Sequence, residues 1–283
     1  MLRNNKFSFT GEGAQYFGLL IANFFLMLIT VLIYTPWAIV KERKFFLENT
    51  RFSGKPFSYT GSGGDMLKGF LIALGVYIVV ILLMYVHVAL YVVGIIALML
   101  IGVPYLIHEL LDYDAKHTHW NEKTFEYTGE VVEFVKLAAT NIGITMVTIG
   151  IYGAWARVSI LKYIMQHLKL GKLTFDFEGE GSELFIIMLK GFFLSMITFG
   201  IYGFWFIKEL NVYMTNKLVV YQDGRKCNFN SELKVGDVFN MIFVGMLLTM
   251  FTCGIGFAWA QVRSIKIMLG AIDISDELDP ENL

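Results

Sequence analysis

The sequence predicts an all-α membrane protein: a polytopic bundle of about six transmembrane helices from tandem repeats, with interfacial amphipathic helices and short β-hairpins between the units. Three observations lead to this expectation. The 283 residues are 56% hydrophobic and 17% charged, with a mean hydropathy of +0.59, whereas soluble domains are about half apolar and about a quarter charged. Long runs lack charged residues, and short sequence signatures recur along the chain. Membrane lipid is therefore the expected surrounding of this protein.

Charge and cysteine content exclude several classes of protein. With 23 basic and 24 acidic residues the net charge is −1, so no basic surplus indicates a nucleic-acid partner. Two cysteines cannot build a disulfide framework. The sequence leaves open whether the protein has a protein partner or forms an oligomer.

Five apolar runs are long enough to cross a bilayer core of about 30 Å, which takes roughly 20 helical residues. These runs are 16–40, 69–107, 137–156, 184–207 and 238–260. As one helix, the run 69–107 would be about 58 Å long, so two crossings with a turn near His87 are expected. A single tilted helix is the alternative, because residues 85–89 contain no Gly, Pro or Asn.

Two recurring sequence signatures divide the chain into repeated units. The opening signature is FSFTGE at 7–12, FSYTGS at 57–62, FEYTGE at 125–130 and FDFEGE at 175–180. The second signature is TVLIYTPW at 30–37, TIGIYGAW at 148–155, TFGIYGFW at 198–205 and TCGIGFAW at 252–259. Each unit is expected to contain an extended segment, a Gly-rich turn, an apolar helix with an aromatic exit, and an interfacial helix. Ser53-Gly54 and Asp223-Gly224 predict hairpin turns.

The predicted organisation is one repeat-built membrane domain over 1–272. Its units span about 7–56, 57–124, 125–174, 175–228 and 229–272. Residues 273–283 form an acidic tail that is expected to be disordered.

Together, the Phe-x-Phe-x-Gly opening, the Gly-Ile-Tyr-x-x-Trp-Ala exit and the Gly-x-x-Phe-x-Phe/Tyr hairpin resemble the YjgN-like family of bacterial inner-membrane proteins. The resemblance covers about residues 5–272 and departs from the exit motif at Gly256. It implies a multi-pass protein of the bacterial inner membrane. It implies no substrate, cofactor or catalytic residue, because the family is a domain of unknown function.

The densest group of potential metal ligands lies between residues 108 and 119. Its candidates are His108, Asp112, His117 and His119, which are ligand types for zinc or other divalent ions. The stretch matches no metal signature such as His-Glu-x-x-His and has the position of a solvated interfacial helix. No nucleophile–base pattern is visible either. The expectation is a protein that is not an enzyme and has no cofactor.

Two sets of residues share a register across the repeats. Asn23 and Asn141 stand fourteen residues before their Trp, where Gly191 and Gly245 stand in later units. This register predicts a helix–helix contact, with a polar path or a lipid headgroup site as the alternative. The exit tryptophans are expected to form an interfacial belt; they are Trp37, Trp155, Trp205 and Trp259.

Three functions are compatible with this pattern. The first is handling of a small solute or lipid at the interface between repeats, where many transporters place their sites. The second is a structural or scaffolding membrane protein that binds partners through its interfacial helices and hairpins. The third is a membrane-embedded enzyme using the 108–119 cluster. A polar midplane cavity would favour the first, and a solid interior packed with Leu and Phe would favour the second.

Overall fold

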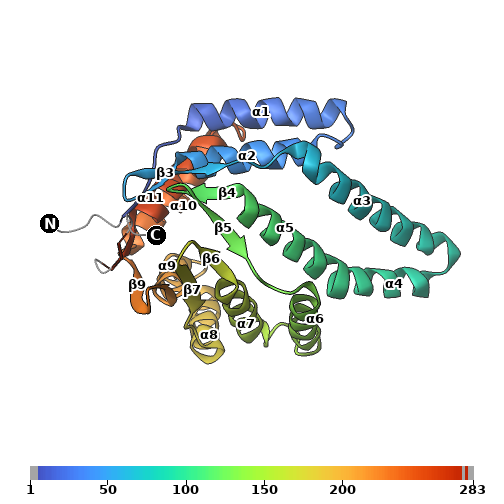
Figure 1. The fold of residues 1–283 in the computed structure, drawn as a ribbon. Helices are drawn as coiled ribbons and strands as arrows, with labels where there is room; N and C mark the ends of the chain where they lie inside the picture. The colour runs from blue at the N-terminus through green and yellow to red at the C-terminus, as the bar shows by residue number, and fades with distance from the viewer. Residues whose placement is uncertain (1–5, 276–277, 280–283) are drawn as a thin grey trace.

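One arrangement, strand–helices–strand, recurs five times in the residues described by the computed structural model, which are 6–275, 278 and 279. The first three units are β1 (Phe7–Phe9), α1 (Gly13–Ile29), α2 (Thr35–Asn49), β2 (Thr50–Phe52); β3 (Lys55–Tyr59), α3 (Gly63–Val86), α4 (Val88–Ala97), η1 (Leu98–Gly102), α5 (Val103–His117), β4 (Thr118–Trp120); and β5 (Lys123–Tyr127), α6 (Val131–Val147), α7 (Gly153–Gln166), β6 (Leu168–Leu170). The last two are β7 (Leu173–Phe177), α8 (Gly181–Ile197), α9 (Gly203–Asn216), β8 (Leu218–Gln222); and β9 (Arg225–Ser231), α10 (Val235–Phe251), α11 (Phe257–Gly270), β10 (Ile272–Ile274). In Figure 1 the helix pairs project from the strands, and α3 and α4 reach farthest.

The strands of the described residues form one ten-stranded antiparallel sheet in which sequence order is also spatial order. Hairpin turns at Ser53-Gly54 and Asp223-Gly224 connect β2 to β3 and β8 to β9, and both confirm the sequence expectation. An isolated antiparallel β-bridge between Lys6, next to β1, and Asp273 in β10 joins the two edges of the sheet. The sheet is therefore a nearly closed ring, which removes most of the exposed strand edge.

The interior of this ring is a core of aromatic and aliphatic side chains. One inward-facing residue from each strand contributes to it: Phe7, Phe52, Phe57, Trp120, Phe125, Leu170, Phe175, Val220, Phe229 and Ile274. Successive Phe rings of this layer stack at centroid distances of about 6.4 Å, as Phe57–Phe125 and Phe125–Phe175 do. A cavity of 190 Å³ with a wholly apolar lining is left at the centre.

Each repeated Thr-to-Trp signature forms a reverse turn between two helices. In the third unit, Thr148 donates its hydroxyl to the carbonyl of Ile144 at 2.8 Å and accepts the N–H of Tyr152 at 3.1 Å. Ile149 and Gly150 have φ of +51° and +87°, and the Gly150 N–H reaches back to the Thr145 carbonyl. This bond resembles the Schellman closure of a helix C-terminus. The same turns occur at Thr30, Thr198 and Thr252.

The expectation of an all-α bundle of six spans is therefore wrong. The four apolar runs that carry the Thr-to-Trp signature turn back within that signature, so each forms a pair of short helices. Both ends of each pair join neighbouring strands, as β5 and β6 show by pairing Phe125 with Leu170. The loops of a six-span bundle would alternate between two faces, whereas here they belong to a single ring.

The run 69–107 contains the expected turn at His87. α3 ends at Val86 and α4 begins at Val88, and His87 has φ −164° and ψ 130°. The Nδ1 atom of His87 accepts the N–H of Ala89 at 3.1 Å, so this side chain caps α4 in place of a Gly or Asn turn. α4 then returns along the end of α3, where Gly94 lies against Val80 (Figure 1).

Part of the tail that was expected to be disordered belongs to the ring. Ile272–Ile274 forms β10, paired with β9. Leu278 is 1% exposed within the ring core. Asp279, which follows Leu278, is held by two hydrogen bonds with the Gln222 side chain. Nε2 of Gln222 donates to the Asp279 carbonyl, and its Oε1 accepts the Asp279 N–H. Residues 276–277 and 280–283 lie outside the described residues.

Glycines at the starts of three helices hold neighbouring units together. Added to Gly63, a Cβ would lie 2.4 Å from Trp37 of the preceding unit, and added to Gly181 it would lie 2.2 Å from Trp155. Trp259 of the last unit packs on Gly13 of the first in the same way. The tryptophan of one unit thus lies over the first helix of the next, and this contact also joins the fifth unit to the first.

We expect Gly181→Ala to destabilise the protein by about 1–3 kcal/mol, because the new methyl group overlaps both the ring and the backbone of Trp155. Gly236→Ala is the matched control: Gly236 also lies in the first turn of an apolar helix but has open space at its Cβ. Thermal unfolding in detergent, followed by circular dichroism, measures the difference. Equal midpoints for both variants would contradict the proposed contact between units.

Candidate membrane interface

Polar and apolar residues are segregated between the ring and the helices. Outward-facing strand positions are mostly polar, and include Ser8, Arg51, Ser58, His119, Glu126, Lys169, Asn228 and Asn230. The helix turns instead expose large apolar side chains: Ile149 is 93% exposed, Phe199 97% and Val31 81%. Exposed apolar surface on this scale is unusual for a soluble monomer and marks an interaction surface.

The turns satisfy their own backbone groups. The Thr hydroxyl in each turn bridges a carbonyl in the last turn of one helix and an N–H at the start of the next, as described above for Thr148. Lipid provides no hydrogen-bond partners, so non-helical backbone in a bilayer must find its partners within the protein. These turns therefore have the chemistry required for contact with lipid.

The exit tryptophans pack on protein as well as facing outward. Trp37, Trp155 and Trp205 stack on the tyrosine three residues earlier, with ring planes 12–14° apart. Trp259 packs on Phe17 at 5.4 Å and is 39% exposed. The Ile-Tyr-x-x-Trp signature thus encodes an aromatic stack at the first turn of the second helix, and Trp37 and Trp155 also contact the following unit.

The Asn and Gly residues that share a register across the repeats lie between the two helices of their own unit. Asn23 donates to the Ala38 carbonyl at 3.4 Å, and Asn141 donates to the Leu137 carbonyl at 2.8 Å and to Ser159 at 3.4 Å. Gly191 faces Phe206, whose ring would lie 2.1 Å from an added Cβ. Gly245 faces the Cβ of Ala260 at 3.4 Å. All four positions are helix–helix contacts within a unit.

The metal-ligand candidates have separate partners. Buried His108 donates from Nε2 to the Gly129 carbonyl at 2.9 Å, and Asp112 pairs with Lys116. His117 donates from Nδ1 to the Tyr113 carbonyl, and His119 lies within 3.0 Å of two threonine hydroxyls. Within the described residues, no three His, Cys, Asp or Glu side chains are grouped closely enough to hold a metal ion.

Sequence reasoning missed a repeated tyrosine that fastens the helices to the ring. The hydroxyl of Tyr163 accepts the N–H of Glu130 at 3.0 Å and lies 3.3 Å from the Glu130 carbonyl, where α6 begins. Tyr213 does the same at Glu180, and Tyr113 at Ser62. The signal was present in the sequence, because these tyrosines are spaced 50 residues apart.

A partly buried ionic cluster joins the first and second units beside the ring. Arg43 pairs with Asp114, and the Tyr59 hydroxyl donates to the same carboxylate at 2.9 Å. Burial raises the pKa of Tyr59, and the positive charge of Arg43 partly opposes this rise. Burial lowers the pKa of Arg43. The cluster fixes the position of α5 against α2 and contains no unpaired nucleophile.

A family model described as "Bacterial protein of unknown function (DUF898)" matches residues 4–122 and 122–176, more than half of the chain. The chain belongs to this family. The YjgN-like resemblance is confirmed by relatives called "Inner membrane protein YjgN". Identity is 40% over 76 residues for the Salmonella typhimurium protein, which is 27% of this chain and 19% of the relative. It is 36% over 63 residues for the Escherichia coli K12 protein, 22% and 16% of the two chains.

These matches span about a fifth or less of the length of the curated relatives. The names of the relatives support an inner-membrane location for the family member described here. No solved structure matches the chain. Within the described residues, two helical segments are long and apolar enough to cross a membrane: Gly63–Val86, and Val88–His117, in which α4, η1 and α5 are continuous.

We expect Asn141→Leu to lower the thermal stability more than Asn23→Leu. Replacing Asn141 removes two hydrogen bonds made by its amide, and their loss should lower the free energy of unfolding by about 1–2 kcal/mol. Asn23 makes one long bond, and its Oδ1 is buried with no partner, so replacing it relieves an unsatisfied group. Unfolding midpoints of the two variants in the same detergent test this order. The reverse order would show that neither amide acts through these bonds.

Proposed function

We propose that the protein is a multi-pass scaffold of the inner membrane, in which the helix pairs lie in the bilayer and the polar strand ring lies at its surface. The observation that carries this proposal is the segregation of polar outward-facing strand residues from apolar outward-facing helix turns. The inner-membrane names of the YjgN relatives agree with it.

The lengths of α3 and of the segment 88–117 support two crossings by the second unit. With 24 and 30 residues, they extend about 36 and 45 Å, enough for a hydrocarbon core of about 30 Å. His87 would then lie at the far side of the membrane, where an imidazole can be solvated. The shorter hairpins place their apolar turns in the bilayer and return to the ring.

The ring interior favours scaffolding over passage of a solute along the ring axis. Its 190 Å³ cavity is lined by apolar side chains from all ten strands, and Leu278 is buried in the same cluster. A polar solute would lose its hydration there without gaining hydrogen bonds, which costs several kcal/mol. A ring of this kind suits a rigid platform that presents polar loops and strand faces to partners outside the bilayer.

The two native cysteines provide a test of this arrangement. Cys253 lies in the α10–α11 turn and is exposed, whereas Cys227 is buried in the ring core. In native membranes we expect Cys253 of a Cys227→Ser variant to resist a water-soluble maleimide, because lipid excludes the reagent and disfavours the thiolate. In denaturant the same thiol should react fully.

The matched control is Ser58→Cys in a chain without native cysteines, because Ser58 is exposed on the outer face of β3. We expect this thiol to react at least tenfold faster than Cys253 in membranes opened to both sides. Equal rates for the two positions would contradict the proposed seating of the hairpin turns in lipid.

A further inference from the structure

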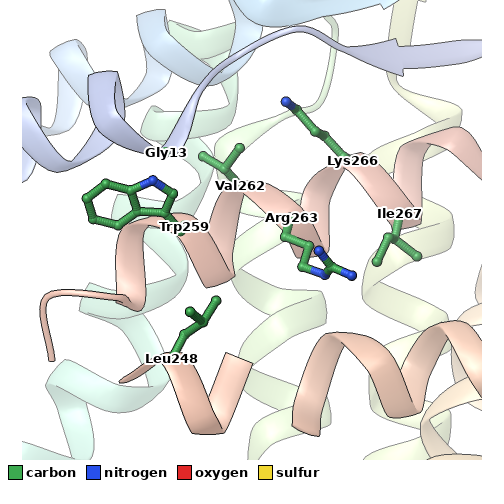
Figure 2. A pocket seen from close by; sticks show the side chains of 7 residues that line it. All are labelled: Gly13, Leu248, Trp259, Val262, Arg263, Lys266 and Ile267. Atoms are coloured by element: carbon green, nitrogen blue, oxygen red, sulfur yellow. The ribbon is translucent and has the colours of Figure 1, made fainter. Parts of the chain in front are cut away.

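The junction between the last unit and the first contains a groove with two chemically distinct ends. The groove has a volume of 580 Å³ and lies along α11, bounded by the start of α1 and by α10. Leu248, Trp259 and Val262 line its apolar part, and Arg263 and Lys266 stand at its edge. Figure 2 shows Trp259 at one end of the groove and the two basic side chains toward the other.

The two basic residues are neighbours along one helix but project to different sides. They are three positions apart, so their Cβ atoms lie roughly 5–6 Å from each other. In Figure 2 Lys266 extends toward the segment that leads into α1, and Arg263 extends away from that segment, on the side of α10. An anionic group between them would meet positive charge from both sides.

Arg263 is held in position without being neutralised. Its Nε and Nη2 atoms donate to Oδ1 of Asn240 in α10 at 3.1 and 2.7 Å. Asn240 carries no charge, so the guanidinium keeps its full charge and its remaining donors. Among the described residues, no carboxylate lies within ion-pair distance of Arg263 or Lys266. The nearby Glu12 caps α1, with its side chain accepting a backbone N–H of that helix.

The apolar part of the groove can accept a hydrocarbon chain. Trp259 has one face on Gly13 and Phe17 of the first unit and keeps 39% of its surface exposed. An indole at this position, with cations one to two turns farther along the helix, suits the boundary between acyl chains and headgroups. Guanidinium and phosphate form paired, charge-assisted hydrogen bonds.

We propose that this groove binds one anionic phospholipid, with an acyl chain against Leu248, Trp259 and Val262 and the phosphate between Arg263 and Lys266. The inference rests on the proposed membrane setting and names a ligand for one junction between units. A lipid held there adds contacts between the first and fifth units, where the strand ring is joined by the bridge at Lys6 and Asp273.

The sequence provides a control at the equivalent positions of the first unit. Arg263 and Lys266 stand four and seven residues after Trp259, and Lys41 and Lys44 stand four and seven residues after Trp37. Lys41 is already placed over the ring of Tyr34 at 5.3 Å. The double variants Arg263→Gln/Lys266→Gln and Lys41→Gln/Lys44→Gln therefore remove the same charge from different junctions.

The test is lipid retention by the full chain, purified in mild detergent and mixed with equal amounts of phosphatidylglycerol and phosphatidylcholine, with bound lipid counted by native mass spectrometry. We expect the unchanged protein to retain one phosphatidylglycerol, and Arg263→Gln/Lys266→Gln to lower this preference at least tenfold. Lys41→Gln/Lys44→Gln should change it less than twofold, and Arg263→Lys/Lys266→Arg should preserve it. Inorganic phosphate in large excess should not displace the lipid.

Three results would overturn the proposal: equal retention of both lipids by the unchanged protein, equal losses in the two Gln double variants, or displacement by inorganic phosphate alone. Unfolding midpoints of all variants verify that each is folded. The outcome is separate from that of the scaffold proposal, since the Gln variant should still protect Cys253 from the water-soluble maleimide. A loss of that protection would count against the membrane seating instead.

Discussion

The antiparallel pairing of each unit's first and last strands is the constraint on which the rest of the structure depends. Because β5 pairs with β6, and β7 with β8, the helices between them must leave the ring and return to the same place. An apolar run long enough to cross a membrane once is thereby forced to reverse. The inward-facing side chains of the paired strands, such as Phe125 and Leu170, then form the common core.

Three of the junctions between units contain the same contact between a tryptophan and a glycine. A tryptophan at the start of one unit's second helix lies on a glycine at the start of the next unit's first helix, as Trp37 does on Gly63. The other two first helices, α6 and α10, begin with Val131 and Val235 instead of glycine, and the unit before α6 has Tyr105 in place of the tryptophan. The junction of the first unit with the second and that of the last with the first both combine this contact with two basic residues, but Lys41 lies over the ring of Tyr34, whereas Arg263 is held by Asn240 beside the groove.

Hydropathy correctly located the apolar helices, but it predicted continuous transmembrane helices at places where the chain reverses. The TIGIYGAW segment at 148–155 reads as the exit of a transmembrane helix because it is apolar and ends in aromatic residues. Its threonine hydroxyl and its two residues with positive φ instead make it a turn that needs no external hydrogen-bond partner. Average hydropathy cannot detect this, because a satisfied apolar turn and a continuous apolar helix have the same composition. The turn at His87 was found correctly, since there the length of the run exceeds what one span needs.

The sequence by itself determined that the protein is apolar and that it belongs with the YjgN-like proteins. It also specified the short hairpins at Ser53-Gly54 and Asp223-Gly224. These properties depend on composition and on local backbone preference. Only the tertiary structure decided that the hairpins join into a ring, that Leu278 enters its core, and that Arg263 and Lys266 border an apolar groove beside α1. These features arise from contacts between residues far apart in the chain, such as Lys6 with Asp273, and no local pattern encodes them.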